Sequence, residues 1–131
     1  MPSPPPEPAR LFVLAGASLL LVVLRDLLEE EGYAVTGSTD VAGALDRIAA
    51  ARPQVLVIEM VITREDRWDL LERLRADAAT ATIPVLLLST TRRLLDRARG
   101  RPEQYGGEAF IGMPFDIADL LRAIRDLLPP M

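Results

Sequence analysis

The side chains that could do chemistry are few and lie at the ends of apolar segments. Glu59 ends an apolar run that begins at residue 54, and Ser89 ends a second run about thirty residues later. A serine nucleophile needs an adjacent base, usually histidine or lysine. The chain contains no histidine and no cysteine, and its 15 basic residues are all arginine. We therefore expect that the protein is not an enzyme.

The missing residue types also restrict metal and cofactor chemistry. Zinc, haem and iron–sulfur sites lose their usual ligands without histidine and cysteine. Schiff-base and Walker-type phosphate sites lose the lysine that they need. We expect no cofactor and no metal site. The net charge of −4 and the pI of about 4.8 argue against direct binding to nucleic acid or to anionic membranes.

Residues 11–24 form an almost wholly apolar run near the N-terminus. The run is too short to span a bilayer, it contains Gly16 and Ser18, and no small-residue cleavage site precedes Arg25. We expect a cytoplasmic protein without a membrane segment.

From residue 10 onward, short apolar segments alternate with amphipathic ones that have helical spacing. The predicted strands are 11–14, 33–37, 54–60, 84–88 and 109–111. The predicted helices are 18–31, about 40–52, 67–76, 92–99 and about 116–128. Five strands and five helices in strict alternation predict an α/β fold with a doubly wound parallel sheet.

Boundary residues define the elements and the domain. Ser18, Thr39 or Asp40, and Asp116 are predicted helix caps, and Gly32 is predicted to end the first helix. The length of 131 residues fits one domain. We expect a disordered proline-rich tail over 1–9, the domain over 10–128 and a short tail over 129–131.

Ligands of doubly wound sheets bind at the carboxyl ends of the strands. The residues predicted at these ends are Ala15, Gly16, Ala17, Glu59, Met60, Ser89, Thr90, Met113 and Pro114. They contain one carboxylate and two hydroxyl groups.

Four segments carry a resemblance to a known family: LRDLLEEEGYAV, ALDRIAAARPQVLVIEM, DLLERLRADAATATIPVLLLST and FIGMPFDIADLLRAIRDLL. They resemble the receiver domain of bacterial two-component response regulators, over about residues 10–128. The resemblance implies a flavodoxin-like fold with five helices and a five-stranded parallel sheet in the order 2-1-3-4-5. It also implies a role in phosphorelay signal transduction.

The chemistry of that family is not matched at most of the corresponding positions. The resemblance places Ala15 and Gly16 where an acidic pair would hold magnesium, and neither has a side-chain oxygen. Glu59 stands at the aspartate that accepts phosphoryl, and it is one methylene longer. Ser89 keeps the hydroxyl, and Met113 replaces the lysine. The sequence thus predicts a degenerate pseudo-receiver that is not phosphorylated at Glu59.

Further departures and matches follow from the same resemblance. Thr63 and Arg67 stand where the family usually has proline and glycine. The Met113–Pro114 pair matches a Lys–Pro peptide that is usually cis, so Pro114 is a candidate cis-proline. Phe110 matches an aromatic switch position, although a core or edge-strand aromatic is the preferred interpretation.

We expect this domain to act as a phosphorylation-independent interaction or dimerisation module. Its partner would be a histidine kinase, an effector domain, another receiver or a second copy of the chain. One alternative is a receiver that still responds to a phosphodonor. Another is that Glu59 mimics the phosphorylated state and locks the domain on, although one carboxylate has less charge and fewer acceptor oxygens than acyl phosphate. Otherwise Glu59 faces solvent, or is hydrogen-bonded to Ser89 or to backbone N–H groups.

The segment RRLLDRARGR forms the one basic patch. The resemblance implies that this region, with the fifth strand, which contains Phe110, and the last helix, is the surface used for dimerisation or partner docking. Its candidate residues are Arg92, Arg93 and Arg97, although a solvated helix face would have the same pattern. A more distant alternative is a small nucleotide-binding α/β domain, suggested by the turn at residues 15–18. Leucines stand at 19–21 where that fingerprint needs further glycines.

Overall fold

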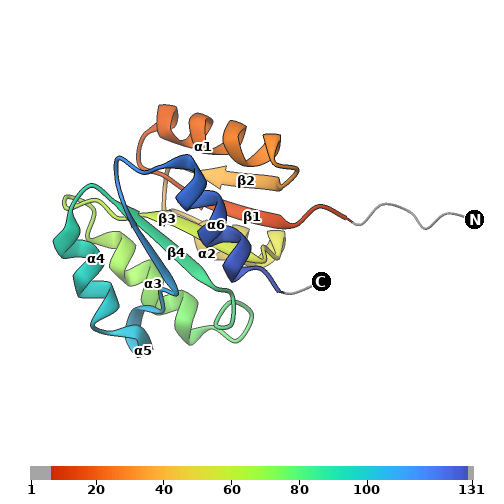
Figure 1. Ribbon diagram of the computed structural model, residues 1–131. Coiled ribbons are helices and arrows are strands. Elements are labelled where there is room, and N and C mark those ends of the chain that lie inside the picture. The colour runs from red at the N-terminus through yellow and green to blue at the C-terminus, as the bar shows by residue number, and fades with distance from the viewer. Residues whose placement is uncertain (1–6, 130–131) are drawn as a thin grey trace, which may run out of the picture.

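The computed structural model describes residues 7–129, and its strands form one parallel sheet. The order is β2-β1-β3-β4-β5, and every neighbouring pair is parallel (Figure 1). The strands are β1 (Arg10–Leu14), β2 (Ala34–Ser38), β3 (Val55–Glu59), β4 (Val85–Ser89) and β5 (Ala109–Gly112). The α/β fold and the strand order expected from the sequence are confirmed.

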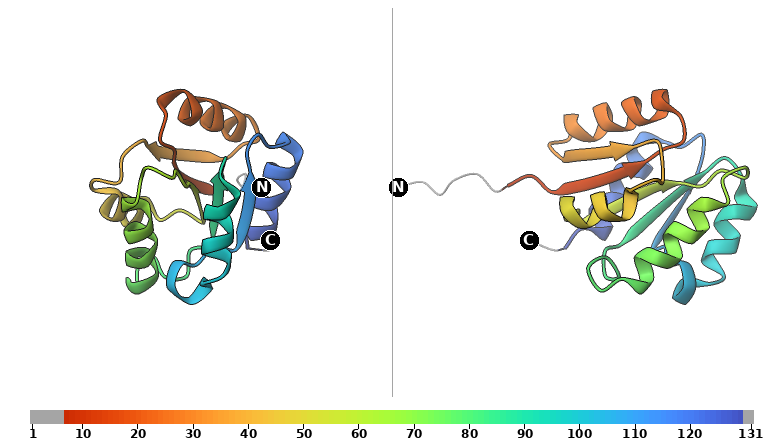
Figure 2. Two further views of the ribbon diagram at one scale, coloured as in Figure 1. Left: turned by 90° about the vertical axis from the view of Figure 1, so that its left-hand side faces the viewer. Right: turned by 180° about the vertical axis from the view of Figure 1, so that it is seen from behind.

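Helices cover both faces of the sheet. They are α1 (Ser18–Glu30), α2 (Ala44–Ala51), α3 (Asp66–Ala76), α4 (Arg92–Arg99), α5 (Pro102–Tyr105) and α6 (Ile117–Leu127). Seen in Figure 2, α1 and α6 lie on one side of the sheet and α2, α3, α4 and α5 on the other. The result is a three-layer sandwich with two hydrophobic cores.

The expectation of five helices is wrong, because residues 7–129 contain six. The additional helix, α5, has only four residues and no amphipathic period that a sequence pattern could show. Pro102 begins it and Gly106, with φ +74°, ends it. Its Tyr105 is buried, with its ring centroid 4.7 Å from that of Trp68 in α3. Tertiary packing of this one ring holds the turn in place.

The central strand β3 is buried on both faces. Leu56 and Ile58 belong to the core under α2, α3 and α4, whereas Val55 and Val57 belong to the core under α1 and α6. This alternation is the period of two expected for a strand, with apolar residues on both sides. Glu59 is the first residue of the strand that is not fully buried.

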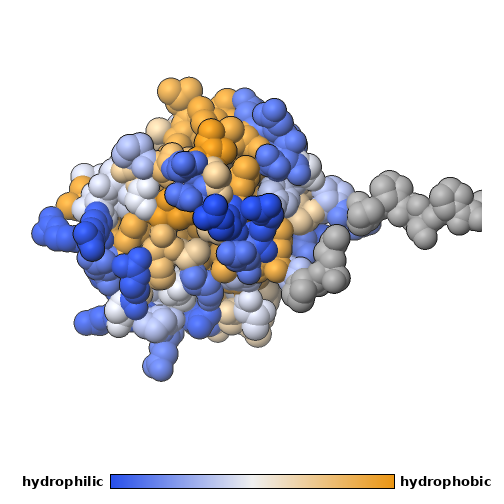
Figure 3. Space-filling view, viewed as in Figure 1, coloured by the Kyte–Doolittle hydropathy of each residue, from blue (hydrophilic) through white to orange (hydrophobic). Residues whose placement is uncertain are grey.

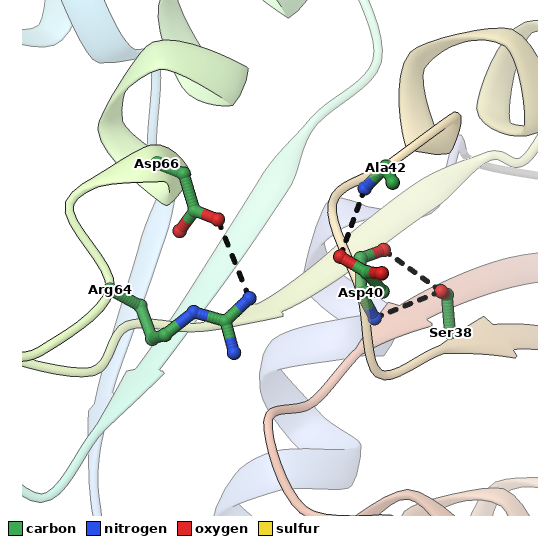
Figure 4. Close-up of polar contacts among 5 residues, drawn as sticks. All are labelled: Ser38, Asp40, Ala42, Arg64 and Asp66. Carbon is green, nitrogen blue, oxygen red and sulfur yellow. Dashed lines mark hydrogen bonds and ion pairs between the residues drawn. The ribbon is translucent and has the colours of Figure 1, made fainter.

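Two of the predicted helix starts are wrong. Ser18 is the first residue of α1 rather than its cap, and the N-cap, Ala17, makes no side-chain hydrogen bond. The second helix begins at Ala44, after Gly43 in the left-handed region with φ +70°, and not after residue 39 or 40. The Asp40 carboxylate instead accepts a hydrogen bond from the Ala42 N–H at 3.1 Å within the preceding loop (Figure 4). Local side-chain bonding of an Asx type therefore delays the helix.

Other predicted boundaries are confirmed. Asp116 caps α6, since its carboxylate accepts a hydrogen bond from the Ala118 N–H at 2.9 Å. Gly32 follows the end of α1 with φ +94°, a conformation that costs glycine least. Most of the predicted N-terminal tail, residues 1–6, and residues 130–131 lie outside the described residues. Within 7–129, no helix is long and apolar enough to cross a membrane.

The double-sided burial of β3 predicts the cost of opening a cavity there. Leu56→Ala should lower the free energy of unfolding by about 2–5 kcal/mol, because the lost methyl groups leave a cavity in a fully covered core. Leu19→Ala is the matched control, since Leu19 is 75% exposed, and it should change stability by less than about 0.5 kcal/mol. Urea unfolding measures both variants. Equal losses for the two would show that β3 is not the centre of the core.

Candidate functional site

The carboxyl ends of four strands meet at one edge of the sheet. The loop after β1 carries Gly16, and β3 ends at Glu59. In the adjoining strands, Ser89 pairs in register with Gly112, and Met113 directly follows β5. The parallel topology thus brings together the positions that the sequence analysis selected.

The Glu59 carboxylate is bound by backbone rather than by a side chain. Its Oε1 accepts a hydrogen bond from the Gly16 N–H at 2.7 Å, a charge-assisted contact of ideal length. A Cβ at position 16 would lie 3.3 Å from the same oxygen, so the absence of a side chain at Gly16 leaves room for the carboxylate. Of the environments considered for Glu59, the backbone N–H partner is the one observed.

The Ser89 hydroxyl makes its hydrogen bonds with backbone groups. Ser89 is 1% exposed, its Oγ donates to the Met60 carbonyl at 2.8 Å, and the Thr91 N–H donates to Oγ at 3.0 Å. The first contact joins the ends of β3 and β4, and the second is local to the loop after β4. The predicted alternative of a Glu59–Ser89 hydrogen bond is not formed.

Arg67 is the residue of this site whose role the sequence analysis missed. It is fully buried in the first turn of α3, and its Nη2 lies 3.4 Å from the point that a Cβ of Gly16 would occupy. Among residues 7–129, none accepts a hydrogen bond from its Nε, Nη1 or Nη2. The only signal in the sequence was that an arginine stood where the resembled family usually has glycine.

The charges around Arg67 act in opposite directions. Burial lowers the pKa of the Arg67 guanidinium, and the nearby Arg64 lowers it further, whereas Glu59, Asp66 and Asp40 raise it. Arg64 is itself paired, with its Nη2 3.4 Å from Oδ2 of Asp66 (Figure 4). An arginine remains charged at neutral pH even when it is buried. The pocket therefore contains a permanent positive charge among carboxylates.

These residues do not fit a divalent metal. Magnesium requires near-octahedral oxygen ligands, and neither Ala15 nor Gly16 supplies a side-chain oxygen. Ala15 is instead buried in the core beneath α1 and α6. Where a side chain of residue 16 would point, the structure has the Arg67 guanidinium. In the described part of the chain, no three acidic side chains are grouped as a metal site would need.

The comparison with known families decides what this scaffold is. The model of the response regulator receiver domain matches residues 16–125. The chain belongs to the response regulator receiver domain family.

Individual relatives of this receiver domain are distant. Protein PilG of Pseudomonas aeruginosa is 26% identical over 92% of this chain and 87% of its own length. The transcriptional regulatory protein PdtaR of Mycobacterium tuberculosis is 30% identical over 90% of this chain. The chain spans 56% of PdtaR and 41% of RpaA, a DNA-binding dual master transcriptional regulator of Synechocystis.

Solved structures show the same fold at low identity. A putative response regulator from Chloroflexus aurantiacus has a TM-score of 0.79 and 22% identity, covering 92% of this chain and 97% of that one. The receiver domain of a Pseudomonas aeruginosa sensor histidine kinase has a TM-score of 0.76 and 20% identity, with coverage of 92% and 97%. The latter structure holds a magnesium ion in its active site cleft.

The fifth-strand side of this receiver domain contains the remaining predicted site residues. The Met113–Pro114 peptide bond is cis, and Met113 packs against the core under α1 and α6. Phe110 is half-buried, and the Arg99 guanidinium carbon lies 4.6 Å from its ring centroid. A cavity of about 350 Å³ between α4 and β5 is lined by Phe110, Met113 and Ser89, among others.

The three arginines proposed as an interaction surface differ in their surroundings. Arg92 and Arg93 are exposed on α4. Arg97 contacts its own domain: its guanidinium carbon lies 4.0 Å from the Trp68 ring centroid, and its Nη2 donates to the Tyr105 hydroxyl at 3.2 Å. Arg92 and Arg93 are therefore available to a partner, whereas Arg97 joins α4 to α3 and α5.

An apolar surface on α1 was not selected from the sequence. Leu19, Val22 and Val23 are 75%, 52% and 43% exposed, and apolar residues gather over α1 at the top of Figure 3. The sequence signal was present, since α1 begins with six apolar residues after Ser18 and has no polar face there. Helix α1 thus presents several apolar side chains to solvent.

The Ser89 contacts predict a structural cost of removing the hydroxyl. Ser89→Ala should lower the free energy of unfolding by about 1–3 kcal/mol, because the Met60 carbonyl loses its donor in a buried place. Ser18→Ala is the control, since Ser18 is exposed and caps no helix; it should stay within about 0.5 kcal/mol. Chemical denaturation measures both. A neutral Ser89→Ala would mean that the hydroxyl is free for another role.

The stacking of Arg97 on Trp68 predicts that two arginines of α4, Arg97 and Arg93, contribute differently to stability. Arg97→Ala should cost about 1 kcal/mol of stability, since the variant loses the stack on Trp68 at a partly exposed site. Arg93→Ala removes the same charge from an exposed position and should cost less than about 0.5 kcal/mol. Thermal and urea unfolding measure the stability of both variants. If Arg93→Ala costs as much as Arg97→Ala, charge rather than stacking is responsible.

Proposed function

We propose that this receiver domain works without being phosphorylated, as an interaction or dimerisation module in bacterial signal transduction. The observation that carries the proposal is the contact of Glu59 with the Gly16 backbone. At the place where the family has a metal-binding acid, this chain has a glycine, which offers the carboxylate a backbone N–H but no side-chain oxygen for a metal. The domain itself is then not an enzyme.

The chemistry of phosphoryl transfer supports the proposal. Such transfer depends on positioning and on cations that stabilise the transferring group. Met113 offers no positive charge where the family has lysine, and no lysine elsewhere in the chain can replace it. Glu59 is one methylene longer than aspartate, which displaces its oxygens from an in-line geometry, and small displacements of this kind cost large factors in rate.

The exposed surfaces support a role in protein binding. The apolar residues of α1 and the basic residues Arg92 and Arg93 lie on separate helices. A histidine kinase, an effector domain, another receiver or a second copy of this chain would be the partner, in the cytoplasm. Relatives that are longer than this chain, such as PdtaR, carry their receiver-like part within a larger protein.

A phosphodonor titration tests the proposal. Beryllofluoride with magnesium should leave the amide resonances around Glu59, Ser89 and Phe110 unchanged, because the pocket offers neither the metal ligands nor the lysine. Acetyl phosphate should likewise leave the mass of the protein unchanged.

Two outcomes would contradict this expectation. Saturable amide shifts, or an acyl phosphate that is lost in Glu59→Gln, would show that the domain is a working phosphorelay receiver. The variant Glu59→Gln also distinguishes a constitutive module from a domain that the Glu59 charge holds in its active state. This variant keeps an acceptor oxygen for the Gly16 N–H but loses the negative charge. Unchanged self-association of Glu59→Gln in sedimentation is expected for a constitutive module, and a change of association state favours the locked form.

A further inference from the structure

Arg67 has a position that is unfavourable for a cation on several grounds. Its side chain is wholly buried, which penalises the charged form. It lies in the first turn of α3, where the helix dipole favours negative charge. Within the described residues its three guanidinium nitrogens lack acceptors, although five N–H groups seek them. A residue in such a position needs compensation from its surroundings.

The compensation comes from the pocket. Nη2 of Arg67 and Oε1 of Glu59 lie 3.4 Å and 3.3 Å from one point, the position that a Cβ of Gly16 would take. They are not hydrogen-bonded to each other, and the carboxylate instead bonds to the Gly16 N–H. The two opposite charges therefore lie near the same point without touching, and the Glu59 carboxylate acts to raise the pKa of Arg67 against the effect of burial.

The Arg67 guanidinium lies beside the place that a metal-binding side chain of residue 16 would occupy. A side chain on residue 16 would project to the point that Arg67 and Glu59 flank. An aspartate there would be the metal-binding acid of the resembled family. The cationic group of Arg67 thus stands where the carboxylate and its bound cation would otherwise be.

We propose that Arg67 is a resident cation that replaces a divalent metal in this pocket and excludes metal ions from it. This inference rests on the proposed phosphorylation-independent function and gives it a physical cause. Loss of the acidic pair alone would leave an empty, negatively charged pocket around Glu59. The arginine neutralises that charge permanently, with no ligand from outside.

The proposal predicts that restoring the acids does not restore a metal site while Arg67 is present. In Ala15→Asp/Gly16→Asp, the new carboxylate at 16 would pair with the guanidinium instead of a metal. Adding Arg67→Gly to this variant should tighten Mn²⁺ binding at least about tenfold, because a unit positive charge within a few ångströms strongly opposes a divalent ion. Manganese titration followed by calorimetry and by paramagnetic broadening of the amide signals near Glu59 measures the affinity.

Arg64→Gly in the same double-aspartate background is the matched control. It removes an equal charge from the loop just before α3, but Arg64 is partly exposed and paired with Asp66. Its effect on Mn²⁺ affinity should be less than about threefold, because exposed charges are screened. Equal gains from Arg64→Gly and Arg67→Gly would overturn the proposal, as would tight Mn²⁺ binding by the double-aspartate variant with Arg67 intact.

A second measurement covers the case in which a triple variant does not fold. In a cycle of Glu59→Gln, Arg67→Met and their combination, the unfolding equilibrium constants should be non-additive by at least about fivefold. Glu59→Gln should be the more harmful single change, since it removes one of the acids that compensate a buried cation. Additive effects would refute the pairing. Neither experiment uses a phosphodonor, so a wild-type response to beryllofluoride would refute the proposed function by a separate route.

Discussion

Burial of the central strands on both faces is the constraint on which the rest of this structure depends. Residues of β1, β3 and β4 alternate between two cores, so almost every position within them must be apolar. Polar side chains can enter only where a strand ends, as at Glu59 and Ser89. The site is thus confined to the carboxyl edge of the sheet by the same packing that stabilises the fold.

At that edge, the charged groups of the site lie close to one another. A carboxylate, a backbone N–H and a buried guanidinium lie around Gly16, a residue without a side chain. Burial lowers the pKa of Arg67, and neighbouring acids offset this only in part; of these acids, Glu59 lies in the same pocket.

The elements that the sequence predicted well are those with a long, repeated signal. The strands predicted at 11–14 and 54–60 come from largely apolar runs. The alternation of such strands with amphipathic helices predicts one fold class, an α/β fold with a parallel sheet. The elements that it predicted poorly depend on local competition or on one contact. Asp40 bonds to a nearby amide and delays α2, and the four residues of α5 are held by the burial of Tyr105 against Trp68. Neither the Asp40 hydrogen bond nor the burial of Tyr105 produces a repeated hydrophobic pattern in the sequence, so neither could be predicted from it.

The sequence by itself determined which chemistry is missing: no lysine exists in the chain, and no oxygen exists on the side chains of Ala15 and Gly16. Residue type suffices for such conclusions, because a functional group that is not encoded cannot be supplied by folding. Only the tertiary structure decided what replaces it. Whether the arginine at position 67 faces solvent or the pocket depends on the path of the loop after β3 and on the space left by Gly16, and both arise from packing between distant segments.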